Sequence, residues 1–285
     1  MERARLTAIF DRAAPLYDTV EPRFFREIAR RLVGRVSIAE DSDVLDLATG
    51  PGLVLSEIAR TVQPRGRLVG VDLSAGMVRE ARARLSAIGV ATNVVVMAAE
   101  QLGFLDESFD LVTMSRAYLL PQRHAILQEI RRVVRHDGCV AIAEFGRLDQ
   151  RWSWKNDLYG RLLRSMPGQA RRVFDAATLK AELVAAGFDR VQVESEDLDI
   201  SFSSLEEWWE SSMSHGERGA LELLKGDARQ AFFDQAQPGP CIEHDGKLHW
   251  RPEVIYAIAR APCGLLLEAR PARPSRRFGP ALQSR

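Results

Sequence analysis

The sequence predicts an α/β fold in which a mostly parallel, seven-stranded sheet is flanked by helices. Two observations carry this prediction. Between residues 43 and 143, short runs rich in β-branched residues alternate with helical patterns, which is typical of βαβ units. Small residues and an aspartate follow the first two strand patterns, and ligands of such sheets bind at the carboxyl ends of the strands.

The strand patterns share a short apolar core bounded by turn residues or charges. Five fall in the alternating region, at 44–48, 67–72, 93–97, 109–115 and 139–145. An alternating strand near 191–194 and a late strand at 254–259 complete the sheet.

Helices are predicted between these strands from apolar stripes and capping residues. One stripe covers 55–62, and a second covers 77–88, begins after Ser74 and ends at Gly89. A third runs from Pro121 to 134 and stops at 137–138. Further helices are expected at 176–186, capped by Asp175, and after the capping box formed by Ser204 and Glu207.

These patterns divide the chain into four parts. Residues 1–42 are expected to form an N-terminal helical cap, and residues 43–200 the sheet-containing core. Residues 201–262 carry a helical insertion and the last strand, and the Pro- and Arg-rich residues 263–285 form a flexible tail. The segment after Phe145 has no strong strand signal and is interpreted as a connection or partial lid.

Composition narrows the class of function. Lys plus Arg and Asp plus Glu both number 39, so no overall basic field favours nucleic acid or an anionic membrane. The three cysteines are far apart and lack metal-ligand spacing, so reduced thiols and no metal are expected. The absence of a leader-like or membrane-spanning apolar run predicts a cytoplasmic protein, with a homodimer left open.

The segment VLDLATGPG, residues 44–52, is the most informative motif. It places Asp46 at the end of a strand and small residues at Ala48, Gly50 and Gly52 before a helix, where backbone can approach a ligand closely. Asp72 ends the next strand, at the distance where a carboxylate binds ribose hydroxyls in Rossmann-like folds. Order and spacing together predict a nucleoside-type ligand.

Five motifs in the same order resemble those of the class I S-adenosylmethionine-dependent methyltransferases, of the methyltransferase-11 and quinone C-methyltransferase type. They are FDRAAPLYD, VLDLATGPG, GVDLSAGMVREAR, AAEQLGFLDESFDLV and LQEIRRVVRHDGCVAIAEF. The resemblance covers about residues 9–259 and implies a Rossmann-like fold, S-adenosyl-L-methionine as cofactor, and methyl transfer to a small-molecule acceptor.

The resemblance also implies cofactor-binding positions. They are Tyr17, Asp46, Ala48, Gly50, Gly52, Asp72, Leu73, Met77, Ala99, Glu100 and Ser115. Tyr17 would close over the cofactor, Asp72 would bind the ribose, and Met77 would lie near the adenine. The family often has an acid just before the alanine and glutamate of the third-strand loop, where this chain has Ala98, so backbone, Glu100 or Gln101 is left to hold the adenine amino group.

Residues for acceptor chemistry are harder to identify. Arg116 and Tyr118 follow the fourth strand at its carboxyl end, and with His124 they are the catalytic candidates. Other candidates are weaker, namely Glu144, His215, His244 and His249. Trp152, Trp154, Trp208 and Trp209 either line an apolar acceptor pocket or form a packed core.

Three functions remain open from the sequence. The first is methyl transfer to oxygen, carbon or nitrogen, in quinone or secondary metabolism. A nicotinamide-dependent reductase is disfavoured, because Leu55 stands where a dinucleotide-binding loop needs its third glycine. The other alternative is a methyltransferase-like cyclase or ligand-binding protein that holds the cofactor without methylating anything.

Overall fold

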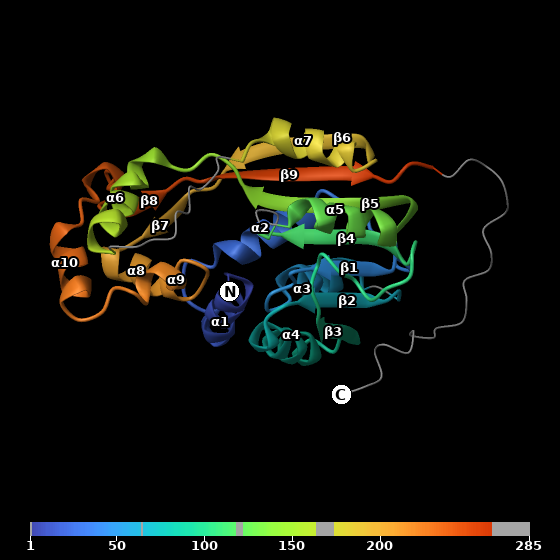
Figure 1. Ribbon diagram of the computed structural model, residues 1–285, viewed down its shortest axis with the longest axis horizontal. Helices are drawn as coiled ribbons and strands as arrows, with labels where there is room; N and C mark the ends of the chain where they lie inside the picture. The colour runs from blue at the N-terminus through green and yellow to red at the C-terminus, as the bar shows by residue number, and fades with distance from the viewer. Residues whose placement is uncertain (1, 64, 118–121, 164–173, 264–285) are drawn as a thin grey trace.

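The computed structural model describes residues 2–63, 65–117, 122–163 and 174–263 of the 285-residue chain. Its centre is a seven-stranded sheet in the order β3-β2-β1-β4-β5-β9-β6 (Figure 1). The strands β1 to β5 are parallel, and β9 runs antiparallel to both β5 and β6. The predicted mostly parallel sheet is therefore confirmed.

The elements of the sheet domain follow in chain order. They are α1 (Glu2–Ala13), the 3₁₀ turn η1 (Ala14–Leu16), α2 (Phe24–Val33), β1 (Val44–Leu47), α3 (Leu53–Val62), β2 (Leu68–Asp72), α4 (Ala75–Ala87), β3 (Thr92–Val96), β4 (Phe109–Ser115), α5 (Arg123–Val133), β5 (Val134–Phe145), α7 (Ala176–Ala185), β6 (Asp189–Asp197) and β9 (Glu253–Arg260).

The remaining elements form a second layer of structure beyond the carboxyl ends of the parallel strands, which we call the lid. They are η2 (Gln150–Trp152), α6 (Ser153–Leu162), β7 (Ile200–Phe202), α8 (Leu205–Met213), α9 (Arg218–Leu221), α10 (Asp227–Gln235), η3 (Gly239–Cys241) and β8 (Leu248–Trp250). The lid thus takes α6 from within the span 43–200 that was expected to be core. The segment after Phe145, interpreted from the sequence as a connection or partial lid, contains η2 and α6.

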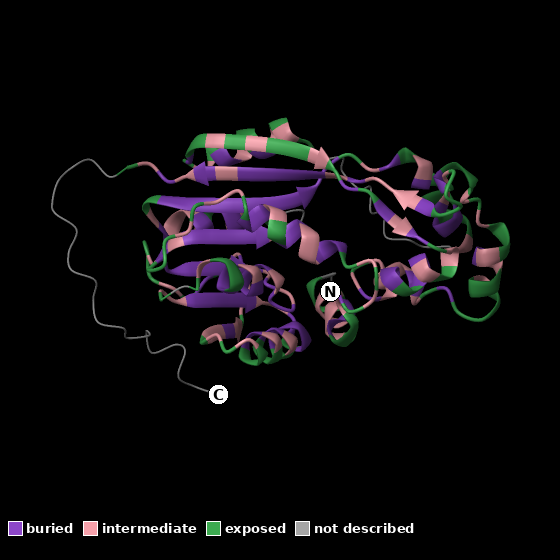
Figure 2. Cartoon of the chain, turned by 180° about the vertical axis from the view of Figure 1, so that it is seen from behind, coloured by how far each residue is buried: buried purple, intermediate pink, exposed green. Residues whose placement is uncertain are grey.

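Alternating burial along the strands explains why helices cover both faces. Leu45 and Val69 face α5 and α7, whereas Val44 and Leu68 face α2, α3 and α4. Successive side chains of a strand point to opposite faces, so both neighbours are buried. Figure 2 shows the central strands buried along most of their length.

Helix starts follow local capping rules. The Ser74 hydroxyl accepts a hydrogen bond from the Met77 N–H at 3.0 Å, and the Asp175 carboxylate accepts one from Thr178 at 2.6 Å. Ser204 accepts one from the Glu207 N–H at 3.2 Å, so all three predicted caps are confirmed.

The boundary between α5 and β5 differs from the prediction. The helix ends at Val133, and Val134 already has extended backbone (φ −76°, ψ 135°) and pairs with Phe109 of β4. The predicted helix end at 137–138 is wrong because pairing with β4 recruits these residues into the sheet. Pro121 lies outside the described residues, as does most of the predicted tail.

Candidate functional site

The loop between β1 and α3 is built from left-handed backbone. Ala48, Gly50 and Gly52 have φ values of 49°, 53° and 78°. A Cβ on Gly50 would meet no atom within 4 Å, whereas one on Gly52 would lie 3.3 Å from both Ala81 and Leu85. Gly52 therefore permits close packing of α3 against α4, and Gly50 borders open space that a ligand can approach.

Asp72 holds this loop from the neighbouring strand. Its carboxylate accepts hydrogen bonds from the Gly50 N–H at 2.9 Å and the Ser74 N–H at 2.8 Å. Burial raises the pKa of Asp72, and these backbone donors oppose the shift. A carboxylate accepts about four hydrogen bonds, so two from the loops leave acceptor capacity for a pair of ribose hydroxyls.

Asp46 lies beneath the loop and is almost completely buried. Its two carboxylate oxygens accept hydrogen bonds from the hydroxyls of Thr49 and Thr113, each at 2.6 Å. Burial raises its pKa to about 7, and the nearby charge of Asp72 adds to the shift. The two threonines were not identified from the sequence, because nothing in the chain shows that β4 brings Thr113 to Asp46.

The N-terminal segment reaches the same crevice. The Tyr17 ring packs against Phe25 with centroids 5.0 Å apart. Burial raises the pKa of the Tyr17 hydroxyl, and the charge of Arg116 opposes the shift while that of Asp72 adds to it. Residues 17, 72 and 116 come from three distant parts of the chain, and the charges of Asp72 and Arg116 both act on the Tyr17 hydroxyl.

The remaining cofactor-binding candidates lie at or beyond the carboxyl ends of β2, β3 and β4. Met77 lies in the first turn of α4 and is 1% exposed, and Ala99 is also buried. Leu73 and Ser115 are half-buried at the ends of β2 and β4. Glu100 forms an ion pair with Arg3 of α1, which makes it a contact of the N-terminal helix as well as a candidate for the adenine.

Arg116 follows β4 at its carboxyl end and contacts two residues of β5. Its backbone is left-handed (φ 63°), and its guanidinium forms an ion pair with Glu144, which is 1% exposed at the end of β5. The guanidinium carbon lies 3.3 Å from the centroid of the Phe145 ring. A fixed cation at this edge of the sheet can orient an acceptor oxygen.

The other catalytic candidates are distributed unevenly. Tyr118 lies outside the described residues. His124 is exposed on α5, with its ring 3.5 Å from the Gln128 amide, and His244 is exposed in the lid. His215 packs edge-on against Phe24 and Phe25 of α2, at centroid distances of 5.8 and 5.4 Å.

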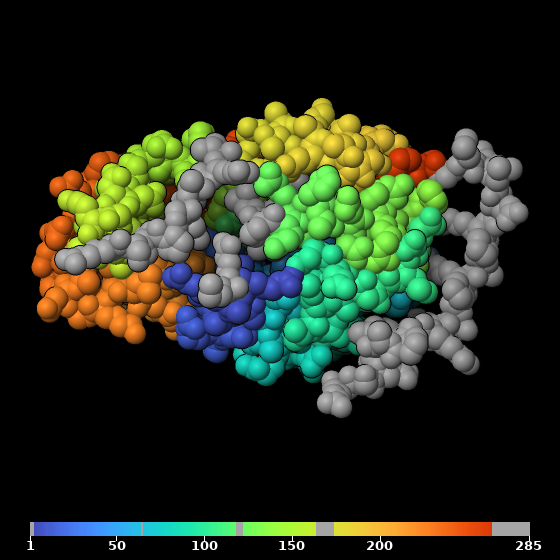
Figure 3. Space-filling view, in the orientation of Figure 1, coloured from blue at the N-terminus to red at the C-terminus, as the bar shows by residue number. Residues whose placement is uncertain are grey.

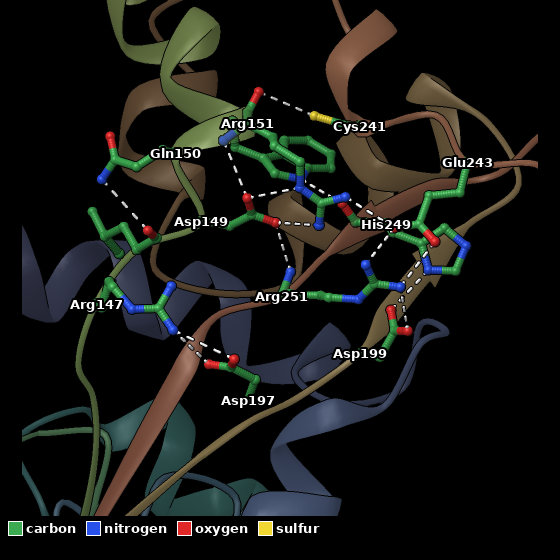
Figure 4. A network of polar contacts seen from close by, with 12 residues as sticks. Arg147, Asp149, Gln150, Arg151, Asp197, Asp199, Cys241, Glu243, His249 and Arg251 are labelled. Carbon is green, nitrogen blue, oxygen red and sulfur yellow. Dashed lines mark hydrogen bonds and ion pairs between the residues drawn. The ribbon is translucent and has the colours of Figure 1, made fainter.

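His249 belongs to a polar network where the sheet meets the lid (Figure 4). Its Nδ1 lies 2.7 Å from Asp199, and its Nε2 lies 3.1 Å from Asp245. The hydrogen bond to Asp199 raises the pKa of His249, which favours the charged imidazolium. Arg151 bridges Asp149 and Glu243 in the same network, and its guanidinium lies 2.7 and 2.9 Å from the two carboxylates. This network ties together the segments that enter and leave the lid.

The tryptophans form the core of the lid. Phe232 is fully buried, and five aromatic rings surround it with centroids 5.3 to 6.1 Å away, those of Trp154, Tyr159, Trp208, Trp209 and Phe233. Both Trp208 and Trp209 are less than 10% exposed. Packing within the lid therefore accounts for these side chains, and the sequence could not separate this arrangement from a pocket lining.

The crevice lies between the sheet and the lid. Figure 3 shows a hollow in the surface where the lid, α1 and the strand ends meet. Among the described residues, no group of three or more His, Cys, Asp or Glu side chains is arranged to hold a metal ion, and no helix could cross a membrane. The site thus consists of loop backbone, buried carboxylates and a fixed arginine.

Comparisons with known proteins show the family of this chain. A family described as methyltransferase domain matches residues 44–138. Nocamycin O-methyltransferase of Saccharothrix syringae is 31% identical over 243 residues, 78% of this chain and 86% of that protein. A ubiquinone/menaquinone biosynthesis C-methyltransferase of Hydrogenovibrio crunogenus is 30% identical over 66% of this chain and 83% of its own.

A solved structure of similar fold comes from Bacillus halodurans. This structure aligns with a TM-score of 0.58 at 23% identity, over 82% of this chain and 98% of that one. This likeness shows that the two chains share a fold. The chain therefore belongs to the class I S-adenosylmethionine-dependent methyltransferases.

Proposed function

We propose that the protein transfers a methyl group to an acidic oxygen of a small molecule of secondary metabolism. The single observation that carries the choice of oxygen is the similarity over most of both chains to nocamycin O-methyltransferase. The fixed Arg116 cation at the strand ends supports it, because a guanidinium stabilises a developing or full negative charge on oxygen. The competing outcome is transfer to carbon, the reaction in the name of the ubiquinone/menaquinone biosynthesis C-methyltransferase.

The residues at the crevice fit the cofactor. The open space beside Gly50 lets the cofactor approach the backbone of the loop, and Asp72 supplies the carboxylate for the ribose. We assign Tyr17 to cover the cofactor, and Met77, Ala99 and Glu100 to flank the adenine. Leu73 and Ser115 are assigned to the rest of the cofactor, and Asp46 holds the loop through Thr49.

When bound, S-adenosylmethionine supplies a methyl group already activated on a sulfonium. The chain's own residues then have to orient the acceptor and exclude water, and orientation alone can remove several kcal/mol of barrier, on the order of 7–11 for well-aligned reactants. In this proposal Arg116 binds the acceptor oxygen and Glu144 holds Arg116 in place. Tyr118 and His124 remain candidates for a base that removes the acceptor's proton.

The proposal extends to the setting of the enzyme. We place it in the cytoplasm, acting on a small molecule and not on nucleic acid, with a homodimer as the assembly to be tested by light scattering. Equal numbers of acidic and basic residues, 39 of each, support the exclusion of nucleic acid.

The test uses S-adenosylmethionine carrying a deuterated methyl group and a pool of small molecules separated into acidic and neutral fractions. We expect mass spectrometry to find a labelled product from the acidic fraction, with the label on oxygen by fragmentation. The Asp72→Ala variant serves as the control without cofactor binding. Cofactor binding without any labelled product would instead support the cyclase or ligand-binding alternative, and label on carbon would refute the oxygen assignment.

A further inference from the structure

Helix α1 makes polar contacts with both sides of the crevice. From adjacent positions, Asp11 contacts α4 in the sheet domain and Arg12 contacts the lid beside α9. We propose that α1 is a strut that supports the cofactor site and the lid together, and that Asp11 is a positioning residue for Asp72. This inference rests on the proposed role of Asp72 in cofactor binding.

The first step is the contact between α1 and α4. One oxygen of the Asp11 carboxylate accepts a hydrogen bond from the Ser74 hydroxyl at 2.6 Å and another from the Gly76 N–H at 2.8 Å. These hydrogen bonds help to lower the pKa of Asp11, against the effect of burial, so the group is charged at neutral pH. A carboxylate at the start of a helix is favoured by the helix dipole and by the unpaired N–H groups there.

The second step connects Asp11 to the crevice. Ser74 donates its hydroxyl to Asp11 and its N–H to Asp72, the latter at 2.8 Å. Ser74 is 1% exposed, so water does not replace either partner readily. Asp11 therefore holds Ser74 in place, and Ser74 in turn orients the Asp72 carboxylate.

The third step is the close fit of α1 against both neighbours. A Cβ on Gly76 would lie 3.0 Å from both the Cα and the carbonyl oxygen of Asp11, so α1 approaches α4 as closely as glycine permits. In the lid, a Cβ on Gly219 would lie 2.6 Å from the side chain of Ile9. Glycines on both sides thus let one helix pack tightly against two elements that are far apart in the chain.

The fourth step is the ion pair with the lid. The Arg12 guanidinium contacts both oxygens of Glu222, at 2.5 Å for the shorter distance, and Glu222 also pairs with Arg218 of α9 at 2.7 Å. Since η1 and Tyr17 follow α1 directly, the placement of α1 also sets where Tyr17 reaches the crevice. Displacing α1 would consequently disturb the ribose acid, the covering tyrosine and the lid at once.

Calorimetric binding of S-adenosylhomocysteine tests the positioning role. Asp11→Ala should weaken binding about tenfold, the loss expected when a charged hydrogen-bond partner that orients the site is removed. Asp11→Asn keeps an oxygen acceptor and should restore most of the affinity. Gly76→Ala should weaken binding several-fold by pushing α1 away while keeping every polar group.

Two matched variants serve as controls. Arg5→Ala changes an exposed residue of α1, and Gly160→Ala adds a methyl group in α6 where it would meet no atom within 4 Å. Both should bind within about twofold of the wild type. Wild-type affinity in Asp11→Ala or, should that variant not fold, in Gly76→Ala would overturn the positioning role. Failure of the wild type itself to bind would instead refute the proposed cofactor site.

Hydrogen exchange tests the connection to the lid. In the wild type, S-adenosylhomocysteine should slow exchange in α9 (Arg218–Leu221), a segment remote in sequence from the cofactor loops. Arg12→Ala should abolish this slowing, because it removes the ion pair to Glu222. Equal slowing in the variant, or none in the wild type that binds the ligand, would refute the strut.

Discussion

Replacing Asp72 with alanine tests the cofactor site most directly. The variant removes the carboxylate that accepts the Gly50 and Ser74 N–H groups and that we assign to the ribose hydroxyls. Two charge-assisted hydrogen bonds to the ribose, at about 1.5 kcal/mol each, amount to about 3 kcal/mol, or a loss of about 100-fold in affinity. Loss of the two hydrogen bonds from the loops should weaken binding further, because the loop is then less ordered.

The assay is titration calorimetry with S-adenosylhomocysteine at constant pH. Asp189→Ala is the matched control, because it removes an exposed aspartate at the start of β6, on the edge of the sheet opposite to the crevice. We expect the control to bind like the wild type, and both variants should give a cooperative melting curve. An Asp72→Ala variant that folds and binds within threefold of the wild type would refute the ribose assignment.

Three further predictions concern separate parts of the molecule. Burial raises the pKa of Asp46 to about 7 from its usual 3.8, so the folded state binds more protons than the unfolded state between about pH 4 and 7, and the free energy of unfolding should fall as pH rises through this window. Urea titrations at several pH values should show a flatter pH dependence of this free energy for Asp46→Asn than for the wild type. Parallel curves for the two proteins would contradict the argument. Arg116→Ala should lower kcat/KM for the labelled acceptor by about 100-fold or more while leaving cofactor affinity within threefold, and an equal loss in both would assign Arg116 to the cofactor instead. Phe232→Ala should cost about 3–5 kcal/mol of lid stability, measured by chemical denaturation followed by tryptophan fluorescence, and a cost below about 1 kcal/mol would show that the lid is loosely packed.

Much of the fold could be predicted because its signals are local. Ser74, Asp175 and Ser204 act on N–H groups three residues away, and each cap is found where the sequence places it. The strands that end at Leu47 and Asp72 could be predicted because small residues follow the first and an aspartate ends the second. The end of α5 was missed because Val133 and Val134 suit a helix and a strand equally, and pairing with Phe109 decides between them.

The sequence also predicted some residues of the candidate site and missed others. The sequence assigned Gly50 and Asp72 to one ligand site, because parallel strands end at one edge of the sheet. The structure adds a 2.9 Å hydrogen bond from the Gly50 N–H to Asp72. The sequence did not identify Asp11 as a partner of Ser74, since nothing in a helical pattern states which helix lies against another. Trp208 was open to two interpretations because a buried aromatic side chain has the same pattern in a core and in a pocket.

By itself, the sequence determined the order of strands and helices, the caps that begin three helices and the loop at Gly50, because each depends on interactions within a few residues. Only the tertiary structure decided that Thr113 binds Asp46, that Glu144 holds Arg116 and that α1 joins α4 to the lid. These contacts join residues that are 28 to 210 positions apart, and their distances depend on how the sheet and helices pack and not on any local preference.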